Sequence, residues 1–264
     1  MEILVFLGYF GAILVGLILG LIGGGGSILT LPILVYLLGV DAVTATGYSL
    51  FIIGITSFVG TLRNANEKKI DFKIGLLFTI PTLLSLYFTR LVIFPAIPGE
   101  ILSIGDFFLM KPMAIMILFA TVMLVASYSM IKGRKDEETE KKTTNFVKLS
   151  VTGLGVGLLS GLVGAGGGFI IIPALVFFAY LPMKNAVATS IFIIAVNSLL
   201  GFTGDIGKHE MDWPFLLLFS SLSIVGIFIG IYLTRFISGT QLKKGFGWFV
   251  LIMGTFILLK EIFL

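Results

Sequence analysis

The sequence has no cysteine, a single histidine and few charged residues, and these shortages exclude several classes of protein. Without cysteine, the chain has no disulfides, thiolate metal sites or cysteine nucleophiles. Charged residues make up 12% of the chain, whereas an average soluble domain has about 25%. The phosphate-binding loop motif of ATP-driven proteins is also missing, so direct use of ATP would need another subunit. We expect no cofactor, no metal site and no bound nucleic acid.

In place of charge, the chain is rich in apolar residues, which make up 57% of it, and its mean hydropathy is +1.11. Most of the uncharged or nearly uncharged stretches approach the roughly 20 residues that a spanning helix needs. They are 3–22, 43–62, 74–88, 112–131, 149–163, 186–202, 213–233 and 246–259. They lack the apolar and polar alternation of barrel strands. The sequence therefore predicts an all-α polytopic membrane protein.

One unusual pattern occurs twice, at an offset of 141 residues. GLIGGGGSILTLPILV begins at Gly20, and GLVGAGGGFIIIPALV begins at Gly161. The short apolar runs that follow the glycines, 28–40 and 169–181, are too brief to cross a membrane comfortably, so we expect half-helices or re-entrant segments. Two copies of a glycine-broken apolar unit are typical of transporters whose site lies between repeats.

The same register, without a gap, pairs further polar residues of the two copies. It pairs Ser49 with Ser190, Ser57 with Ser198 and, beyond a loop, Asp71 with Asp212.

A charged segment divides the two copies. Residues 132–148 carry six lysines or arginines, so the positive-inside rule predicts a cytoplasmic linker. We expect an N-terminal transmembrane repeat over 1–131 and a C-terminal one over 149–264.

The distribution of basic residues predicts that the two repeats are inverted. The loop from Arg63 to Lys73 and the loop at Arg235 are basic and are expected inside, whereas the loop from Asp205 to Asp212 has one lysine and is expected outside. The equivalent residues Asp71 and Asp212 then fall on opposite sides. Each half would hold about five segments, with both chain ends outside. The alternative is eight spans and parallel halves, if the short segments re-enter without crossing.

The glycine clusters are candidate anion sites. The positions that we single out are Gly24, Gly25, Gly26 and Ser27 in the first copy, and Gly166, Gly167 and Gly168 in the second. Glycine in a helix interior costs about 1 kcal/mol relative to alanine, so a cluster stops the helix. The freed N–H groups, followed by the positive end of a half-helix, suit a small anion. The alternative is that these glycines only let helices pack closely.

Neutral polar residues in the segments after the half-helices form a second group of candidate site residues. They are Thr46, Ser49 and Thr56 in the first half, and Asn185, Thr189, Ser190 and Asn197 in the second. Spacings of seven residues place Ser49 with Thr56, and Ser190 with Asn197, on one helix face. Such groups bind an oxyanion without burying a counter-charge. The alternative is that each hydroxyl bonds the carbonyl one turn back, but the Asn197 amide needs a real partner.

Charges within the spans are scarce. Arg90 follows Thr89 and Arg235 follows Thr234 near helix ends, so we expect both arginines to snorkel to the membrane surface. The loop that holds Asp205, His209 and Glu210 is expected to be solvated, with a proton-linked role for the histidine as the alternative.

At these motifs the chain resembles the TauE/SafE family of permeases, also called the sulfite exporter family. The resemblance covers nearly the whole chain, through the motifs at Gly20 and Gly161 and through AVATSIF at Ala186. It implies a transporter of small sulfur-containing anions, such as sulfite or organosulfonates, in the bacterial or archaeal cytoplasmic membrane. The first copy departs from the last motif and reads TATGYSLF from Thr44, so the two halves are expected to contribute unequally.

Three functions compete at this point. The leading hypothesis is a secondary transporter that works by alternating access around a site between the two repeats. A passive anion channel is the alternative. A remote alternative is an intramembrane hydrolase, which would need Ser49 or Ser190 to meet the only histidine. We therefore expect no enzyme, with a small anion and the lipid bilayer as partners, and assembly into a homodimer stays open.

Overall fold

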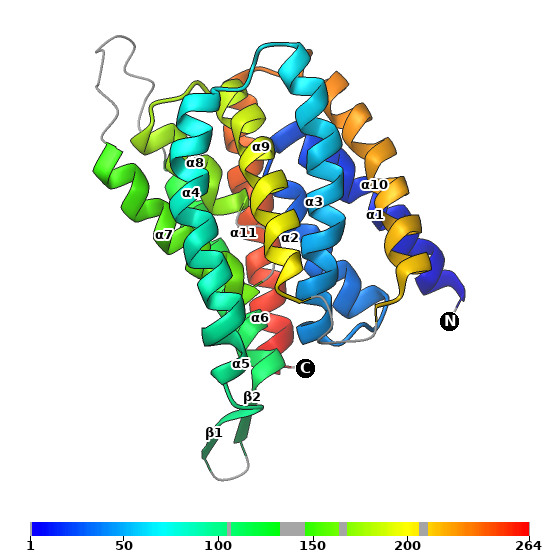
Figure 1. The fold of residues 1–264 in the computed structure, drawn as a ribbon. Helices are drawn as coiled ribbons and strands as arrows, with labels where there is room; N and C mark the ends of the chain where they lie inside the picture. Colours follow the sequence, from blue (N-terminus) through cyan, green and yellow to red (C-terminus); the bar gives the residue numbers. More distant parts are fainter. Residues whose placement is uncertain (1, 105–106, 133–145, 164–167, 206–210, 264) are drawn as a thin grey trace.

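The computed structural model describes residues 2–104, 107–132, 146–163, 168–205 and 211–263, which form a bundle of helices standing side by side (Figure 1). Six helices within these ranges are long and apolar enough to cross a membrane. The predicted all-α, multi-pass architecture is therefore confirmed.

The helices follow the apolar stretches of the sequence. In chain order they are α1 (Glu2–Ile22), α2 (Gly25–Pro32), the π-helical turn η1 (Ile33–Leu37), α3 (Ala42–Asn66), α4 (Phe72–Phe88), the π-helical turn η2 (Thr89–Ile93), α5 (Phe94–Ala96), α6 (Lys111–Ile131), α7 (Phe146–Val163), α8 (Gly168–Phe178), α9 (Met183–Thr203), α10 (Trp213–Leu233) and α11 (Gly239–Phe263). Each long stretch predicted from the sequence lies inside one long helix, and the two short runs fall largely within α2–η1 and α8.

Aspartates begin three of these helices. Asp41 accepts hydrogen bonds from the first backbone N–H groups of α3. Asp71 and Asp212 cap α4 and α10, and each accepts a 3.0 Å hydrogen bond from the N–H three residues further on. These carboxylates satisfy N–H groups that have no partner within the helix, so they fix where the helices start.

The helix ends gather at two faces of the bundle (Figure 1). The first, which we call the hairpin face, carries the starts of α3 and α6 and the ends of α5 and α9. A two-stranded antiparallel hairpin, β1 (Glu100–Ile104) and β2 (Phe107–Met110), projects from it. The sequence did not predict these strands. The second, the basic face, carries the end of α3, the start of α9, the end of α10 and the lysines Lys69 and Lys184.

The first glycine cluster turns the chain back on itself. Gly23 has a φ of +70°, a left-handed conformation that glycine adopts without strain. After this turn, α2 and η1 run antiparallel to α1. A Cβ atom on Gly26 would lie 2.4 Å from the carbonyl oxygen of Val15, and one on Gly8 would lie 2.4 Å from the side chain of Leu38.

Glycines also let two pairs of long helices touch through their backbones. A Cβ on Gly16 of α1 would lie 1.8 Å from the carbonyl oxygen of Ser223 in α10. A Cβ on Gly157 of α7 would lie 2.1 Å from the carbonyl oxygen of Thr82 in α4. Close backbone approach of this kind is how helices pack within lipid, where no hydrophobic force drives them together.

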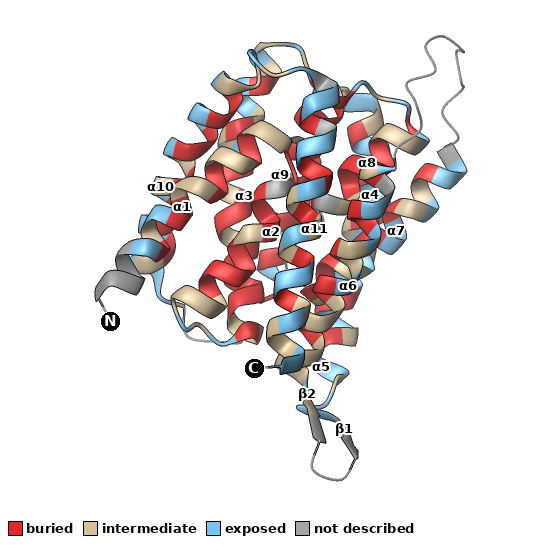
Figure 2. Cartoon of the chain, turned by 180° about the vertical axis from the view of Figure 1, so that it is seen from behind, coloured by how far each residue is buried: buried red, intermediate tan, exposed pale blue. Residues whose placement is uncertain are grey.

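Helices α3 and α9 form the centre of the bundle. Most of their residues are buried, and Figure 2 shows them enclosed by the other helices. They pack against each other, α4 packs on α9 and α10 packs on α3. The Thr189 hydroxyl in α9 accepts a 3.0 Å hydrogen bond from the N–H of Asp71, and the Tyr48 hydroxyl in α3 accepts one of 3.0 Å from the N–H of Asp212. The two central helices thereby hold the starts of α4 and α10.

Candidate functional site

The two glycine interruptions meet inside the bundle. A Cβ on Gly24 would lie 1.8 Å from the carbonyl carbon of Gly168, and one on Gly168 would lie 2.4 Å from the Cα of Gly24. No other residue fits at either position without moving the backbone. Gly166 and Gly167 lie outside the described residues.

The other members of the first cluster have local partners. Gly25 is the first residue of α2, and Gly26 packs on α1 as described above. Ser27, which is fully buried, donates a 2.6 Å hydrogen bond to the carbonyl oxygen of Gly24. The hydroxyl therefore bonds one turn back within the start of α2, as serine hydroxyls commonly do.

One face of α9 lines this glycine contact. A Cβ on Gly23 would lie 2.4 Å from the Ser190 hydroxyl oxygen, and one on Gly168 would lie 2.5 Å from the end of the Ile194 side chain. Asn197 follows Ile194 by three residues, on the same face of the helix. Ser190 and Asn197, which the sequence placed on one face, therefore lie along the side of α9 that is turned towards the interruptions.

Asn197 is the most unusual polar residue of this region. Its side chain is fully buried, and neither its amide nitrogen nor its amide oxygen has a hydrogen-bond partner among the described residues. Leaving a buried polar group unsatisfied costs about 1–3 kcal/mol. A residue that is retained at such a cost is a candidate for contact with a ligand.

The remaining predicted residues have neighbours of their own. Ser49 is fully buried and donates to the carbonyl oxygen of Thr46, and Thr56 donates to that of Ile52. Both follow the alternative in which a hydroxyl bonds one turn back. The hydroxyl of Thr189 holds the start of α4, as described above, and the amide of Asn185 donates to the carbonyl oxygen of Lys69.

Two further buried serines were not singled out as site residues: Ser198, which follows Asn197 directly, and its counterpart in the first repeat, Ser57. Ser57 and Ser198 are fully buried, and their hydroxyl oxygens have no partner within the described part of the chain. The signal for them was already in the sequence, because the offset of 141 residues pairs them.

The expectation for Arg90 was wrong. Only 1% of its side chain is exposed, and its Nη1 atom lies 3.1 Å from Oδ2 of Asp205 and 3.1 Å from the Thr46 hydroxyl oxygen. The helical path does not end near Arg90, because η2 and α5 carry it on to Ala96. The arginine is therefore buried against protein groups instead of snorkelling.

The expected solvated loop needs the same correction at Asp205, which is 5% exposed. His209 and Glu210 lie outside the described residues. The Arg235 side chain is 49% exposed and pairs at 2.7 Å with Glu67; its place at the membrane surface stays a prediction.

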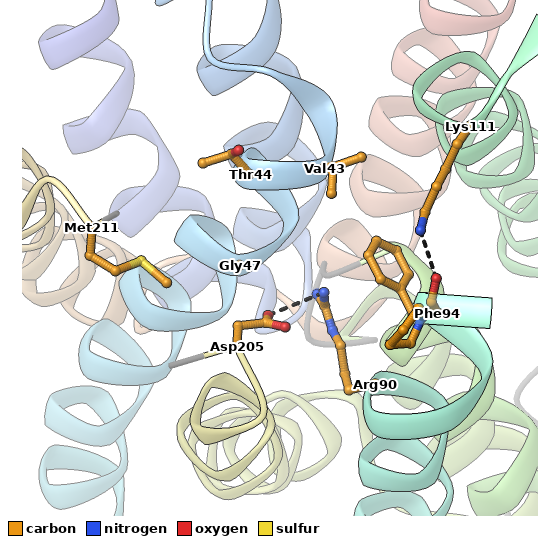
Figure 3. A pocket seen from close by; sticks show the side chains of 9 residues that line it. Val43, Thr44, Gly47, Arg90, Phe94, Lys111, Asp205 and Met211 are labelled. Atoms are coloured by element: carbon orange, nitrogen blue, oxygen red, sulfur yellow. Dashed lines mark hydrogen bonds and ion pairs between the residues drawn. The ribbon is translucent and has the colours of Figure 1, made fainter. Parts of the chain in front are cut away.

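A cavity of about 220 Å³ lies beside this ion pair at the hairpin face (Figure 3). Its lining comes from α3, the η2–α5 segment, the start of α6 and the ends of the α9–α10 connection. The residues are Val43, Thr44, Gly47, Arg90, Phe94, Pro95, Lys111, Asp205 and Met211. A much smaller cavity, of about 20 Å³, lies at the basic face and includes Asn64, Lys69 and Lys184 in its lining. The two cavities thus lie at opposite ends of α3 and α9.

Metal chemistry has no donor set within the described residues, since no group of three or more His, Cys, Asp or Glu side chains comes together there. The candidate ligand groups are amides, hydroxyls, backbone groups and two cations. Such groups suit an anion.

Comparison with known proteins gives one consistent result. Residues 9–257 match the family model described as sulfite exporter TauE/SafE. A probable membrane transporter protein from Xylella fastidiosa is 28% identical over 256 residues, which cover 94% of this chain and 92% of the relative. A probable membrane transporter protein from Methanocaldococcus jannaschii is also 28% identical and covers 94% of both chains. The probable membrane transporter protein YunE of Bacillus subtilis is 30% identical over 78% of this chain and 81% of its own. No solved structure matches the chain significantly.

Proposed function

Because this chain belongs to the TauE/SafE family of membrane transporters, we propose that it is a secondary transporter of small sulfur-containing anions such as sulfite or organosulfonates. The observation that carries the proposal is the meeting of Gly24 and Gly168 beside a face of α9 that bears Asn197, whose amide has no partner in the described part of the chain. The family is one of transporters, so the chain is not an enzyme.

In the proposed site, the anion binds where the interruptions meet. Neutral N–H and amide donors stabilise its charge without a buried counter-charge, and the α2 helix directs the positive end of its dipole to the same point. Gly24 and Gly168 meet backbone against backbone, which is a closed contact. Substrate would enter when Gly24 and Gly168 separate.

The proposed mechanism is alternating access between two inverted repeats, residues 1–131 and 149–264. Reciprocal contacts support it. Tyr48 and Thr189 are 141 residues apart, as are Asp71 and Asp212, and each hydroxyl accepts a hydrogen bond from the N–H of the aspartate in the other half. The start of α3 and the end of α9 line one cavity, so these central helices run in opposite directions.

For the orientation, we propose that the basic face is cytoplasmic and that the chain lies in the inner, cytoplasmic membrane. The support is the cluster of lysines at that face, where Lys69 and Lys184 line a cavity, together with the positive-inside rule. The linker, 132–148, would then be cytoplasmic and both chain ends would be outside.

Flux of labelled sulfite into proteoliposomes tests the proposal. A Gly24→Ala variant should lose most of its flux, because its Cβ cannot fit against Gly168. The matched control is Gly155→Ala in α7, where a Cβ would meet nothing within 4 Å. Gel filtration in detergent checks that both variants remain folded. Full flux in a folded Gly24→Ala protein would overturn the proposed site.

Exchange of labelled against unlabelled sulfite separates a transporter from a channel. An alternating-access transporter accumulates label transiently when unlabelled substrate is present on the other side. A passive channel shows no such counterflow, so its absence would replace the transporter mechanism with the channel alternative.

A further inference from the structure

The cavity at the hairpin face holds an ion pair that the proposed central site does not use. Arg90 comes from η2 and Asp205 from just beyond the end of α9, and both are almost completely buried. An ionised group inside a membrane protein is costly and in general marks a substrate or ion path. Removing one partner of such a pair leaves a buried charge without compensation.

A second cation lies beside this pair in the cavity wall. The Lys111 ammonium donates a 2.6 Å hydrogen bond to the carbonyl oxygen of Phe94 and lies 4.2 Å from the centre of the Phe94 ring. The Arg90 guanidinium lies 5.0 Å from the centre of the same ring (Figure 3). Two cations and one carboxylate therefore line the described part of the wall, and the two cations are groups that can bind an anion.

Asp205 occupies the place that an anion would take. Its Oδ2 atom is 3.1 Å from Nη1 of Arg90. A Cβ on Gly47 would lie 3.2 Å from the same carboxylate oxygen, so the bare backbone of α3 makes room for this group. A carboxylate beyond the C-terminal end of α9 is disfavoured by the helix dipole. The ion pair with Arg90 is one interaction that holds Asp205 in the cavity wall.

The opposite end of the bundle shows that helix packing does not require this charge pair. The residue 141 positions before Asp205 is Asn64, whose amide donates a 3.0 Å hydrogen bond to the carbonyl oxygen of Gly60. Asn64 lines the much smaller cavity. An amide is therefore sufficient at the corresponding end of α3. Helix packing alone does not explain the carboxylate and the guanidinium at the hairpin face.

The cavity has room for a small hydrated anion. Its volume of about 220 Å³ equals that of roughly seven water molecules at about 30 Å³ each. A small oxyanion, such as sulfite or a small sulfonate, fits together with part of its hydration shell. Guanidinium groups bind two oxygens of such an anion through two parallel N–H bonds.

We propose that this cavity is a second anion-binding site, in which an oxyanion displaces the Asp205 carboxylate from Arg90, with Lys111 supplying further positive charge. The inference rests on the proposed function for the identity of the anion. It places a second binding site at the hairpin face, where substrate would enter or leave the transporter. Asp205 acts as a tethered competitor that covers Arg90 until substrate arrives.

Two variants test whether the substrate anion displaces the Asp205 carboxylate from Arg90. Asp205→Asn removes the competitor and should lower the KM for sulfite about tenfold. The double variant Arg90→Gln with Asp205→Asn removes both charges of the pair and should raise the KM about tenfold, because a hydrogen bond to a charged group contributes about 1.5–3 kcal/mol. The double variant also avoids the unpaired buried charge that Arg90→Gln alone would leave.

Arg235→Gln is the matched control, since Arg235 also follows a threonine at the end of a long helix but lies exposed at the basic face. Its KM should equal that of the wild type. Thermal unfolding in detergent, titrated with sulfite, is the second measurement. The midpoint should respond at about tenfold lower sulfite in Asp205→Asn than in the wild type.

The outcomes separate this proposal from the proposed function. If the wild type carries sulfite and both variants keep its KM and its thermal response, the second site is refuted and the transporter stands. If the wild type carries no sulfur oxyanion, the proposed function fails. The shift of the thermal response in Asp205→Asn then supports the anion site, and its absence refutes it.

Discussion

Replacing Asn197 by leucine should make the protein more stable and inactive at once. The amide is fully buried, and both of its polar atoms lack partners among the described residues. Each unsatisfied group costs about 1–3 kcal/mol, whereas an apolar group of the same shape costs nothing of this kind. Leucine has the same number and branching of side-chain heavy atoms as asparagine, so it keeps the approximate shape of the side chain. We therefore expect the free energy of unfolding to rise by about 2 kcal/mol, which is roughly 4–8 °C in the unfolding midpoint.

The assay is thermal unfolding of the purified protein in detergent, together with sulfite flux in proteoliposomes. Thr56→Val is the matched control, because Thr56 occupies the corresponding position in α3 and its hydroxyl is satisfied by the carbonyl oxygen of Ile52 at 2.7 Å. The control should lose up to about 1 kcal/mol. A less stable Asn197→Leu protein, or one with wild-type flux, would refute the argument that the amide is kept for a ligand.

Three further predictions concern stability. Gly155→Ala should raise the free energy of unfolding by about 1 kcal/mol in a denaturant titration, because its Cβ meets nothing and alanine favours the helix. Gly157→Ala should lower the unfolding midpoint measurably and weaken the packing of α7 on α4, since its Cβ would lie 2.1 Å from a carbonyl oxygen. Hydrogen bonds from Lys69 and Arg235 hold the pKa of the Glu67 carboxyl below its usual 4.5. Their stabilisation is therefore present above that pH and is lost as the pH falls through the lowered pKa. Glu67→Gln should accordingly flatten the fall of the unfolding midpoint in acid, and an unchanged acid profile would contradict this assignment.

Composition and apolar length were sufficient to predict the helices. The stretch 43–62 lies inside α3, and the stretch 213–233 matches α10 at both ends. Segments that are apolar on every side carry no face that indicates a partner, so the sequence did not predict that α4 packs on α9 or that α10 packs on α3. The hairpin β1–β2 was also missed, because its residues lie in a stretch too short and mixed to signal strands.

The candidate site was predicted unevenly, for physical reasons. The glycines were found because a repeated cluster that breaks an apolar run is rare, and Gly24 and Gly168 do meet. Arg90 was misread because its partner, Asp205, is 115 positions away, and no local pattern reports such a distance. The better rule would have been to treat any ionisable residue within an apolar segment as functional.

The hydrogen bond between Thr189 and Asp71 has a consequence for biogenesis. A ribosome releases α4 into the bilayer long before it has synthesised α9, so the cap of α4 is incomplete until the second half of the polypeptide arrives. We therefore expect the helices of the first half to stay loosely assembled until α9 has been inserted. If the chain is divided within 133–145 and both fragments are produced in the same cell, the fragments should associate and fold. Either fragment alone should be degraded.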